Sequence, residues 1–344
     1  MLNYLPNAID CVDMSKELAM GLKELRKRIS SSNVPSSKLD ETINIATWNI
    51  REFGKKLRMR ESLHFIAEIM NEFDLIAVIE LRDNLEDLGY VLNVLGPYWG
   101  AVYSDYIPDA GGNYERIGYV YDRRAVVPTG LASEASPPRV KDKATDEYTS
   151  AISWWRSPYI GSFSAGKFDF IAISAHIKWG ESAKSRVSEL RLLADWIDQR
   201  VAERGWEDKD IIVMGDFNIP EYDDELFKAV TDKGLRVPDA IRGLEHGSNL
   251  KKNKRYDQIL HYPQYTKSFT NRAGVLDFYR GDWSKLYPGV KKTHEEFTFE
   301  ISDHLPLWIQ MNTDIEDERL DQIIRGQTQV PRSEVLPPRS STGF

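Results

Sequence analysis

The chain lacks the features of secreted and membrane proteins. Its only cysteine, Cys11, has no partner in the chain, so a disulfide framework is excluded and a reducing, cytoplasmic compartment is expected. No apolar run approaches the roughly 20 residues of a membrane helix, and the first residues do not form a signal-peptide core. We therefore expect no membrane partner, and we expect the protein to act as a monomer.

An excess of positive charge is also missing. The formal net charge of the 344 residues is −8, which argues against holding nucleic acid by overall positive charge. The cations gather instead in local clusters at 55–60, 123–124, 251–255 and 291–292. Each cluster alone is explained by a solvated loop, but together they are compatible with a polyanionic substrate.

The composition is that of one large globular domain with two extensions. Residues 1–40 contain an amphipathic helical pattern at 9–29 and then a polar linker. The main domain is predicted at 41–313. Residues 314–344 are predicted to form a short helix and a disordered tail, because the tail is rich in proline and has almost no aliphatic pattern.

Within the main domain, strands and helices alternate irregularly. Short apolar runs bounded by turn residues predict strands at 43–49, 74–80, 116–122, 168–176 and 210–216. Helical patterns occur at 60–71, 84–95, 182–201 and 223–231. Such a mixture predicts layers, in which sheets bury one another and helices cover the outside.

The most informative pattern is that the predicted strands end on polar residues. Asn49, Glu80 and His176 each end such a run, and Asp216 and Asn218 follow another. Because strand ends of a packed sheet converge on one rim, we expect these side chains to lie together. A single ending of this kind would carry little information.

A rim that also holds Asp257 and Asp303 beside Glu80 and Asp216 needs a compensating charge. Two carboxylates about 4 Å apart repel by roughly 4 kcal/mol at an effective dielectric near 20. The available ligands are hard oxygens, which favour Mg²⁺ or Mn²⁺, or Ca²⁺, over structural zinc. Any one of these acids alone is equally explained as a surface residue.

Two short motifs carry proton and phosphate chemistry. In GDFN, Gly215 permits a tight turn, and Asp216 and Asn218, two residues apart in extended backbone, are expected to project to the same side. In SDHLPLW, Asp303 precedes His304, which can donate to a phosphate oxygen. A strand-ending turn with an Asx cap and a structural histidine are the alternatives for these two motifs.

Seven motifs together resemble a known family. TWNIREFG, IELRD, ERIGYVYD, ISAHIKWG, MGDFNIP, KRYDQIL and SDHLPLW follow the order and spacing of the endonuclease/exonuclease/phosphatase superfamily, and are most similar to its deoxyribonuclease I-like branch. The resemblance spans about residues 43–311. It implies a four-layered α/β sandwich of two central, mostly antiparallel sheets flanked by helices, with the site at their common edge.

The resemblance also implies a role for each matching residue. Glu80 would be the principal metal ligand with Asn49 beside it, and Asp303 would hold the metal or its neighbouring histidine. The implied catalytic residues are a histidine pair with supporting acids and the residues that orient water and phosphate: His176 with Glu115, His304 with Asp257, and Asp216 with Asn218. Arg156 would lie near the phosphate, and Arg82 would reach into a DNA minor groove.

Three departures from the family pattern are visible. Ile79 stands where a glutamine usually precedes the metal-binding glutamate, so one polar support is missing. Asn113 replaces a DNA-contacting tyrosine, and one cysteine cannot form the disulfides of secreted deoxyribonucleases. These departures count against efficient cleavage of double-stranded DNA but leave the phosphodiesterase core complete.

The predicted function is metal-dependent hydrolysis of DNA phosphodiester bonds by in-line attack of water. Asp216 is the expected orienting base, and His176 and His304 are the expected donors to the phosphoryl oxygens. The same scaffold serves phosphatases and phospholipid phosphodiesterases of the inositol phosphate type, so these are the alternatives. A non-catalytic nucleic-acid-binding module is a further alternative, for which Ile79 is the best support.

Overall fold

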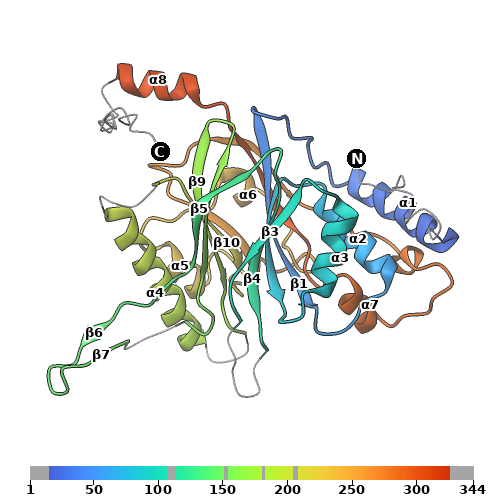
Figure 1. Ribbon diagram of the computed structural model, residues 1–344, viewed down its shortest axis with the longest axis horizontal. Helices are drawn as coiled ribbons and strands as arrows, with labels where there is room; N and C mark the ends of the chain where they lie inside the picture. Colours follow the sequence, from blue (N-terminus) through green and yellow to red (C-terminus); the bar gives the residue numbers. More distant parts are fainter. Residues whose placement is uncertain (1–14, 107–112, 151–153, 180–182, 204–207, 326–344) are drawn as a thin grey trace, which may run out of the picture.

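The computed structural model describes residues 15–106, 113–150, 154–179, 183–203 and 208–325 (Figure 1). The helices are α1 Lys16–Ser30, α2 Arg60–Met70, α3 Glu86–Leu95, α4 Ala183–Ala202, α5 Glu225–Thr231, α6 Asp239–Arg242, the 3-10 turn η2 Trp283–Leu286, α7 His294–Glu300 and α8 Glu316–Ile324. The strands are β1 Thr42–Phe53, β2 Leu75–Leu81, β3 Trp99–Tyr103, β4 Arg116–Asp122, β5 Val127–Glu134, β6 Val140–Lys141, β7 Tyr148–Thr149, β8 Tyr159–Ala165, β9 Phe168–His176, β10 Ile211–Asp216, β11 Asp257–His261, β12 Phe269–Val275 and β13 Leu307–Asn312.

Two sheets form the centre of the molecule. The first sheet has the order β12-β13-β1-β2-β4-β3, and the second has the order β11-β10-β9-β8-β5. The first contains one parallel pair, β1 with β2, and the second contains one, β9 with β10. The remaining pairs are antiparallel, so the expectation of mostly antiparallel sheets is confirmed.

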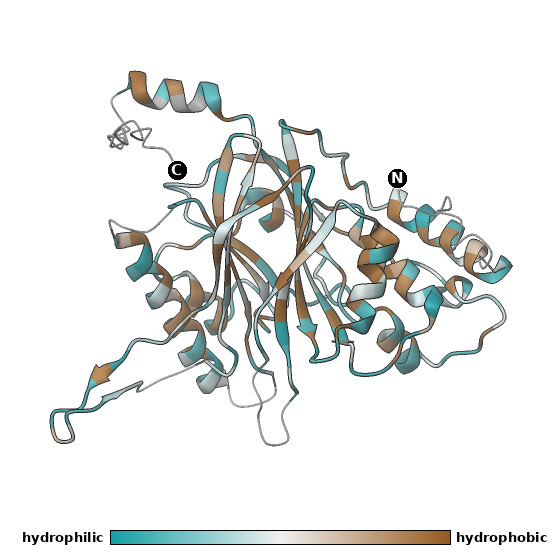
Figure 2. Ribbon diagram, in the orientation of Figure 1, coloured by the Kyte–Doolittle hydropathy of each residue, from teal (hydrophilic) through white to brown (hydrophobic). Residues whose placement is uncertain are grey.

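The two faces of β1 show how the first sheet divides the core. Ile43 and Ile45 join the apolar cluster that contains the second sheet, whereas Ala46 and Trp48 join the cluster that contains α1, α2, α3 and α7. This follows from the two-residue period of a strand, which sends successive side chains to opposite faces. Apolar residues accordingly occupy both sheets and the inner faces of the helices (Figure 2).

The helices complete the outer layers. α4 and α5 cover the second sheet on one side of the molecule, and α2, α3, α7 and α1 lie beyond the first sheet on the other (Figure 1). α1 packs on α2, where Arg26 forms an ion pair with Glu68 at 2.5 Å. The expected four-layered α/β sandwich is therefore confirmed.

Most predicted elements are present at nearly the predicted positions, but the N-terminal helix begins later than predicted. The N-terminal helix begins at Lys16, because the Ser15 hydroxyl caps it by accepting from the Leu18 N–H at 3.0 Å. Its predicted first residues lie outside the described ranges, as does the predicted disordered tail. α8 is the expected short C-terminal helix. Among the described residues, no helix is long and apolar enough to cross a membrane.

The ends of the central strands have unusual backbone conformations. The register of β1 and β2 shifts between Asn49 and Phe53, and Glu52 and Glu80 have φ values of 48° and 64°. Gly215 in β10 has a φ of 142°, and a Cβ there would lie 2.0 Å from the carbonyl oxygen of Ala175. Such conformations cost energy and commonly occur at functional sites.

Candidate active site

The polar strand ends meet at one edge of both sheets. In the second sheet, Asp216 lies opposite His176 of β9 and opposite Asp257 of β11. In the first sheet, Asn49 is paired with Ile79, next to Glu80. These strand ends come together because β1 runs parallel to β2 and β9 runs parallel to β10.

Asp216 is the centre of the arrangement. Its Oδ2 accepts a hydrogen bond from Asn49 Nδ2 at 3.0 Å, and the same Nδ2 donates to Glu80 Oε1 at 3.0 Å. Its Oδ1 accepts from the Asn218 N–H at 2.9 Å. Burial raises the pKa of Asp216 and outweighs the nearby histidines, so this carboxylate is a stronger base than an exposed aspartate.

Two histidines approach the same oxygen of Asp216. His176 Nε2 lies 3.8 Å from Asp216 Oδ2, and His304 Nε2 lies 3.9 Å from it. The Nδ1 of His176 is 3.0 Å from Glu115 Oε2, and that of His304 is 2.7 Å from Asp257 Oδ2. Since 3.8 and 3.9 Å exceed hydrogen-bonding distance, each imidazole is oriented by its own acid while its Nε2 can serve a bound group.

The acids around His304 favour its charged form. Burial by itself lowers the pKa of His304, but the charges of Asp257 and Asp216 and the hydrogen bond to Asp257 hold it well above its ordinary value. The imidazolium can therefore donate a proton or a charged hydrogen bond from Nε2.

Glu115, the acid that orients His176, is held by arginines. Arg156 Nε lies 2.5 Å from Glu115 Oε2, and Arg82 Nη1 lies 3.5 Å from Oε1. Burial alone would raise the pKa of Glu115, but His176, Arg156 and Arg82 lower it to about 2. Glu115 is therefore a permanent anion that fixes the ring of His176.

Arg82 has contacts that were not predicted. The residue is 3% exposed, forms a second ion pair with Glu52 at 3.0 Å, and donates to the carbonyl of Asn113. The guanidinium is engaged by two acids in this structure, and the contact of Arg82 with a DNA groove stays a prediction. Arg82 thereby supports Glu115.

Asn218 differs from expectation. It adopts a φ of 51°, in the left-handed region that asparagine tolerates, rather than an extended conformation. Its NH₂ group donates to the carbonyl of Ile177 at 2.7 Å. The side chain therefore ties the turn after β10 to the end of β9, and its contact with a phosphate stays a prediction.

A hard divalent cation fits the oxygen atoms at this edge. The buried Asn49 Oδ1 and Asp257 Oδ1 have no hydrogen-bond partner within the described ranges. Ligand atoms of Asp216, Asp257 and His304 lie within 4.8 Å of one another, but the hydrogen bond between His304 and Asp257 already explains their proximity. Glu80 and the unpaired Oδ1 of Asn49 are hard oxygen donors at the same edge, of the kind that a divalent cation prefers.

Asp303, a predicted metal ligand, and Ile79, which replaces the usual glutamine before Glu80, need separate description. Asp303 is half-buried, and its charge contributes to the raised pKa of His304. Ile79 is fully buried in the core between the sheets. Glu80 nevertheless has support, because its Oε2 accepts the Glu52 N–H at 2.9 Å.

Two serines of the site were not predicted. Ser248 Oγ donates to Asp257 Oδ2 at 2.5 Å, and Ser302 Oγ donates to the carbonyl of Asn49 at 2.6 Å while accepting the His304 N–H at 3.0 Å. Ser302 is the first residue of the SDH motif, which is a usable signal. Ser248 lies in a loop without any pattern, so only the fold reveals it.

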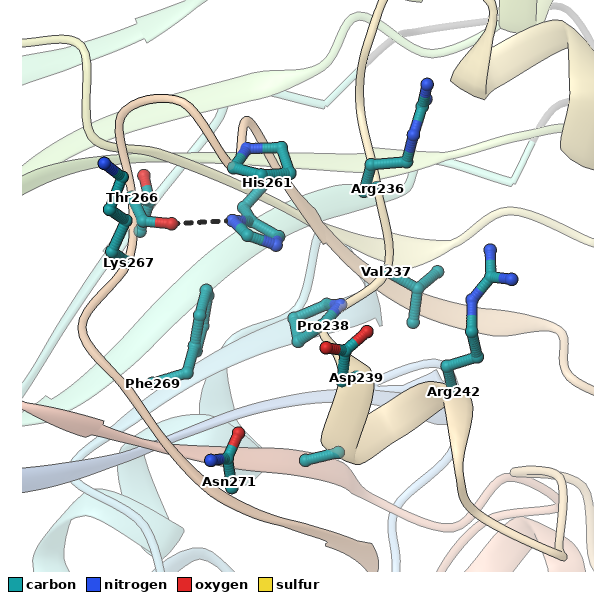
Figure 3. Close-up of a pocket in the computed structure, with 12 residues that line it drawn as sticks. Arg236, Val237, Pro238, Asp239, Arg242, His261, Thr266, Lys267, Phe269 and Asn271 are labelled. Carbon is teal, nitrogen blue, oxygen red and sulfur yellow. Dashed lines mark hydrogen bonds between the residues drawn. The ribbon is translucent and has the colours of Figure 1, made fainter.

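A separate cavity lies away from these residues. It measures about 630 Å³ and opens beside His261, at the opposite end of β11 from Asp257 (Figure 3). None of the predicted site residues lines it. This cavity is thus distinct from the edge where the acids and histidines converge.

Several known proteins are similar to this chain. Residues 46–304 match the model of the endonuclease/exonuclease/phosphatase family. A protein named Deoxyribonuclease from Thioalkalivibrio sp. (strain K90mix) is 28% identical over 295 residues, covering 80% of this chain and 72% of that protein. An endonuclease/exonuclease/phosphatase family protein from Bacteroides thetaiotaomicron has a TM-score of 0.52 at 16% identity, covering 80% of this chain and 99% of that one. The mannosyl-6-phosphatase Bt3783 from Bacteroides thetaiotaomicron VPI-5482 has a TM-score of 0.50 at 15% identity, covering 78% of this chain and 98% of that one.

These similarities differ in what they establish. At such low identities the two solved structures show the fold alone, and one of them is named a phosphatase. The family match, in contrast, covers most of the chain and includes the strand ends described above. The chain belongs to the endonuclease/exonuclease/phosphatase family.

Proposed function

We propose that this protein is a metal-dependent nuclease that hydrolyses DNA phosphodiester bonds by in-line attack of water. One observation carries the proposal: a single oxygen of Asp216 is faced by the Nε2 atoms of His176 and His304, each oriented by a separate acid. The name of the Thioalkalivibrio relative supports DNA as the substrate.

Asp216 is the group that orients and deprotonates the attacking water. Its carboxylate is fixed from two sides, by the Asn49 amide and by the Asn218 N–H. The raised pKa that burial gives Asp216 improves proton abstraction. Geometry and basicity thus favour the same role.

The histidines stabilise the charge that develops on the phosphoryl oxygens. His304 donates as an imidazolium, because Asp257 and Asp216 hold its pKa high. His176 donates from Nε2 while Glu115 fixes its ring through Nδ1. Fixed donors at the developing charge are commonly the largest single contribution to catalysis.

Glu80, together with Asn49, would hold the divalent cation, with Mg²⁺ or Mn²⁺ as first candidates and Ca²⁺ as another. When bound, such an ion neutralises negative charge on phosphate oxygens.

The two arginines act on the site through Glu115. Arg156 and Arg82 keep Glu115 ionised, and Arg156 is the nearer of the two to Oε2 of that acid.

A nuclease assay with metal titration tests the proposal. We expect hydrolysis of single-stranded and plasmid DNA that is abolished by EDTA and restored by Mg²⁺ or Mn²⁺. Asp216→Asn is the control that should stay inactive with metal. Activity that persists after exhaustive chelation would contradict the proposal.

The same panel separates the alternatives. Preferential hydrolysis of an inositol phosphate would indicate a phosphatase of this family. Tight DNA binding without cleavage in either metal would indicate a binding module. Against the module stands the presence of both histidine–acid pairs and the buried Asp216 in one assembled site.

A further inference from the structure

Two exposed tryptophans flank the active site. Trp155 is 53% exposed and Trp179 is 64% exposed, although tryptophan is usually largely buried. Trp155 immediately precedes Arg156, the partner of Glu115, and Trp179 follows His176 by three residues. Both rings are therefore attached to backbone segments that carry the His176 half of the site.

A buried acid holds these two segments together. Glu189 of α4 is 4% exposed, and its Oε1 accepts the Trp155 N–H at 2.9 Å while its Oε2 accepts the Lys178 N–H at 3.4 Å. Burial raises the pKa of Glu189, and these two hydrogen bonds oppose that rise. The backbone segments that carry the two tryptophans are thus attached to the same residue of α4.

The aromatic surface continues to the catalytic histidine. The rings of Trp179 and Tyr256 lie 5.5 Å apart at 76°, and those of Tyr256 and His304 lie 6.0 Å apart at 37°. Tyr256 also directly precedes Asp257, the acid that orients His304. A flat group resting on Trp179 would consequently lie beside the reacting phosphate.

Each exposed tryptophan has a cation beside it. The Arg186 guanidinium lies 5.7 Å from the Trp179 ring and donates to the carbonyl of Asn218 at 3.1 Å. Lys178 Nζ lies 5.8 Å from the Trp155 ring. Alternation of aromatic faces and cations matches the alternation of bases and phosphates along a nucleic acid strand.

We propose that Trp155, Lys178, Trp179, Arg186 and Tyr256, the tryptophan ledge, bind unpaired bases next to the scissile phosphate. The proposal rests on the nuclease function and narrows its substrate to single-stranded or frayed DNA. Bases inside a duplex already stack on each other and cannot present a face to a side chain without being extruded. The ledge therefore favours strands whose bases are free.

The test compares three substrates of equal length: a single-stranded oligonucleotide, its duplex, and a strand of base-free sugar phosphates. In Trp179→Ala and Trp155→Ala we expect KM for the single strand to rise about tenfold with little change in kcat, because stacking contributes strongly per base. Trp179→Phe and Trp155→Phe should retain most of the affinity. The loss on the base-free strand should be much smaller.

Tyr98→Ala is the matched control. Tyr98 is 56% exposed, and the Arg124 guanidinium lies 4.9 Å from its ring, so it has the same chemistry as the ledge. The Arg123 N–H donates a hydrogen bond to the Tyr98 carbonyl. Tyr98 therefore lies near Asp122, at the opposite end of β4 from Glu115. This variant should match the wild type on all three substrates.

The outcomes separate the two proposals. An equal loss on base-bearing and base-free strands would show a structural role and overturn the ledge. Wild-type behaviour of both alanine variants on the single strand would overturn it as well, while leaving the nuclease function standing. If the wild type cleaves no phosphodiester strand in any divalent metal, the nuclease function fails and the ledge fails with it.

Discussion

The two histidine–acid pairs of the site are built from the same residue types but in opposite directions across the sandwich. His176 ends β9 of the second sheet and pairs with Glu115, which directly precedes β4 of the first sheet. His304 precedes β13 of the first sheet and pairs with Asp257, which begins β11 of the second. Each pair therefore crosses from one sheet to the other.

The surroundings of the two acids differ more than the pairs themselves. Glu115 is flanked by the guanidinium groups of Arg156 and Arg82, whereas Asp257 accepts a hydrogen bond from the hydroxyl of Ser248. The charge of Glu115 thus acts on Arg156 and Arg82 as well as on His176, whereas that of Asp257 acts mainly on His304. The comparison teaches that the acid of one pair is also bound to two arginines, whereas the acid of the other pair is bound to its histidine and a neutral hydroxyl.

The largest effect is expected where the two pairs meet. Asp216→Asn and His304→Ala should each lower kcat by about 10²- to 10⁴-fold, since they remove the base and the charged donor. His176→Ala should fall toward the lower end of this range, because Arg156 and Arg82 share the charge of the acid that orients His176. The exposed His246→Ala serves as the control.

These losses are to be measured as kcat on a DNA strand, with thermal unfolding of each variant as a check on folding. If any two of Asp216→Asn, His176→Ala and His304→Ala keep full activity, the assignment of the site is wrong. A larger loss in His176→Ala than in His304→Ala would reverse the comparison of the two pairs.

The next effect concerns the stability that Glu115 contributes. Its pKa is lowered from 4.5 to about 2 in the folded protein, so its stabilisation is present above 4.5 and is lost as the pH falls toward 2. The shift corresponds to roughly 3 kcal/mol in the free energy of unfolding. Glu115→Gln should show this loss at about pH 7, and a smaller difference from the wild type at about pH 3.

Urea unfolding of the wild type and of Glu115→Gln at both pH values measures the difference. Glu134→Gln is a suitable comparison, because Glu134 is an acid at a strand end whose pKa is raised by burial. A constant difference between wild type and Glu115→Gln across this range would show that the arginines do not act through the charge of Glu115.

The smallest effect is a shift in the pH dependence of activity. His304 must be protonated to donate, so activity falls as the pH rises through its raised pKa. Asp257→Asn removes the largest source of that rise and should move the alkaline limb of kcat/KM to lower pH, with about tenfold lower activity at mildly alkaline pH. Glu115→Gln should leave this limb in place. An unmoved limb in Asp257→Asn would contradict the assignment of His304 as the proton donor.

The elements that the sequence predicted are those with a buried, strongly apolar strand or an amphipathic helix. β1, β2, β9 and β10 are almost entirely buried, so their composition alone identifies them. β5 and β12 are mostly exposed or half-buried. They are strands because their backbones pair with a neighbouring strand, not because they bury apolar side chains. Such edge strands have little pattern to detect.

The sequence could identify which residues form the site but not how their side chains are oriented. Strand ends identified Asn49, His176 and Asp216, because rigid backbone carries such residues to one edge. The directions of Arg82 and Asn218 depend on left-handed backbone at nearby positions, including Glu52, Glu80 and Asn218 itself. Sequence reasoning from an extended strand cannot anticipate those conformations.

The crossing of both histidine–acid pairs between the sheets has a consequence for biosynthesis. β1 is hydrogen-bonded to β13, so residues 42–53 find one of their neighbours only after residues 307–312 have left the ribosome. His304 lies three residues before β13, so its pairing with Asp257 also awaits the C-terminal part of the domain. A growing chain therefore cannot complete the site until nearly the whole domain has been made.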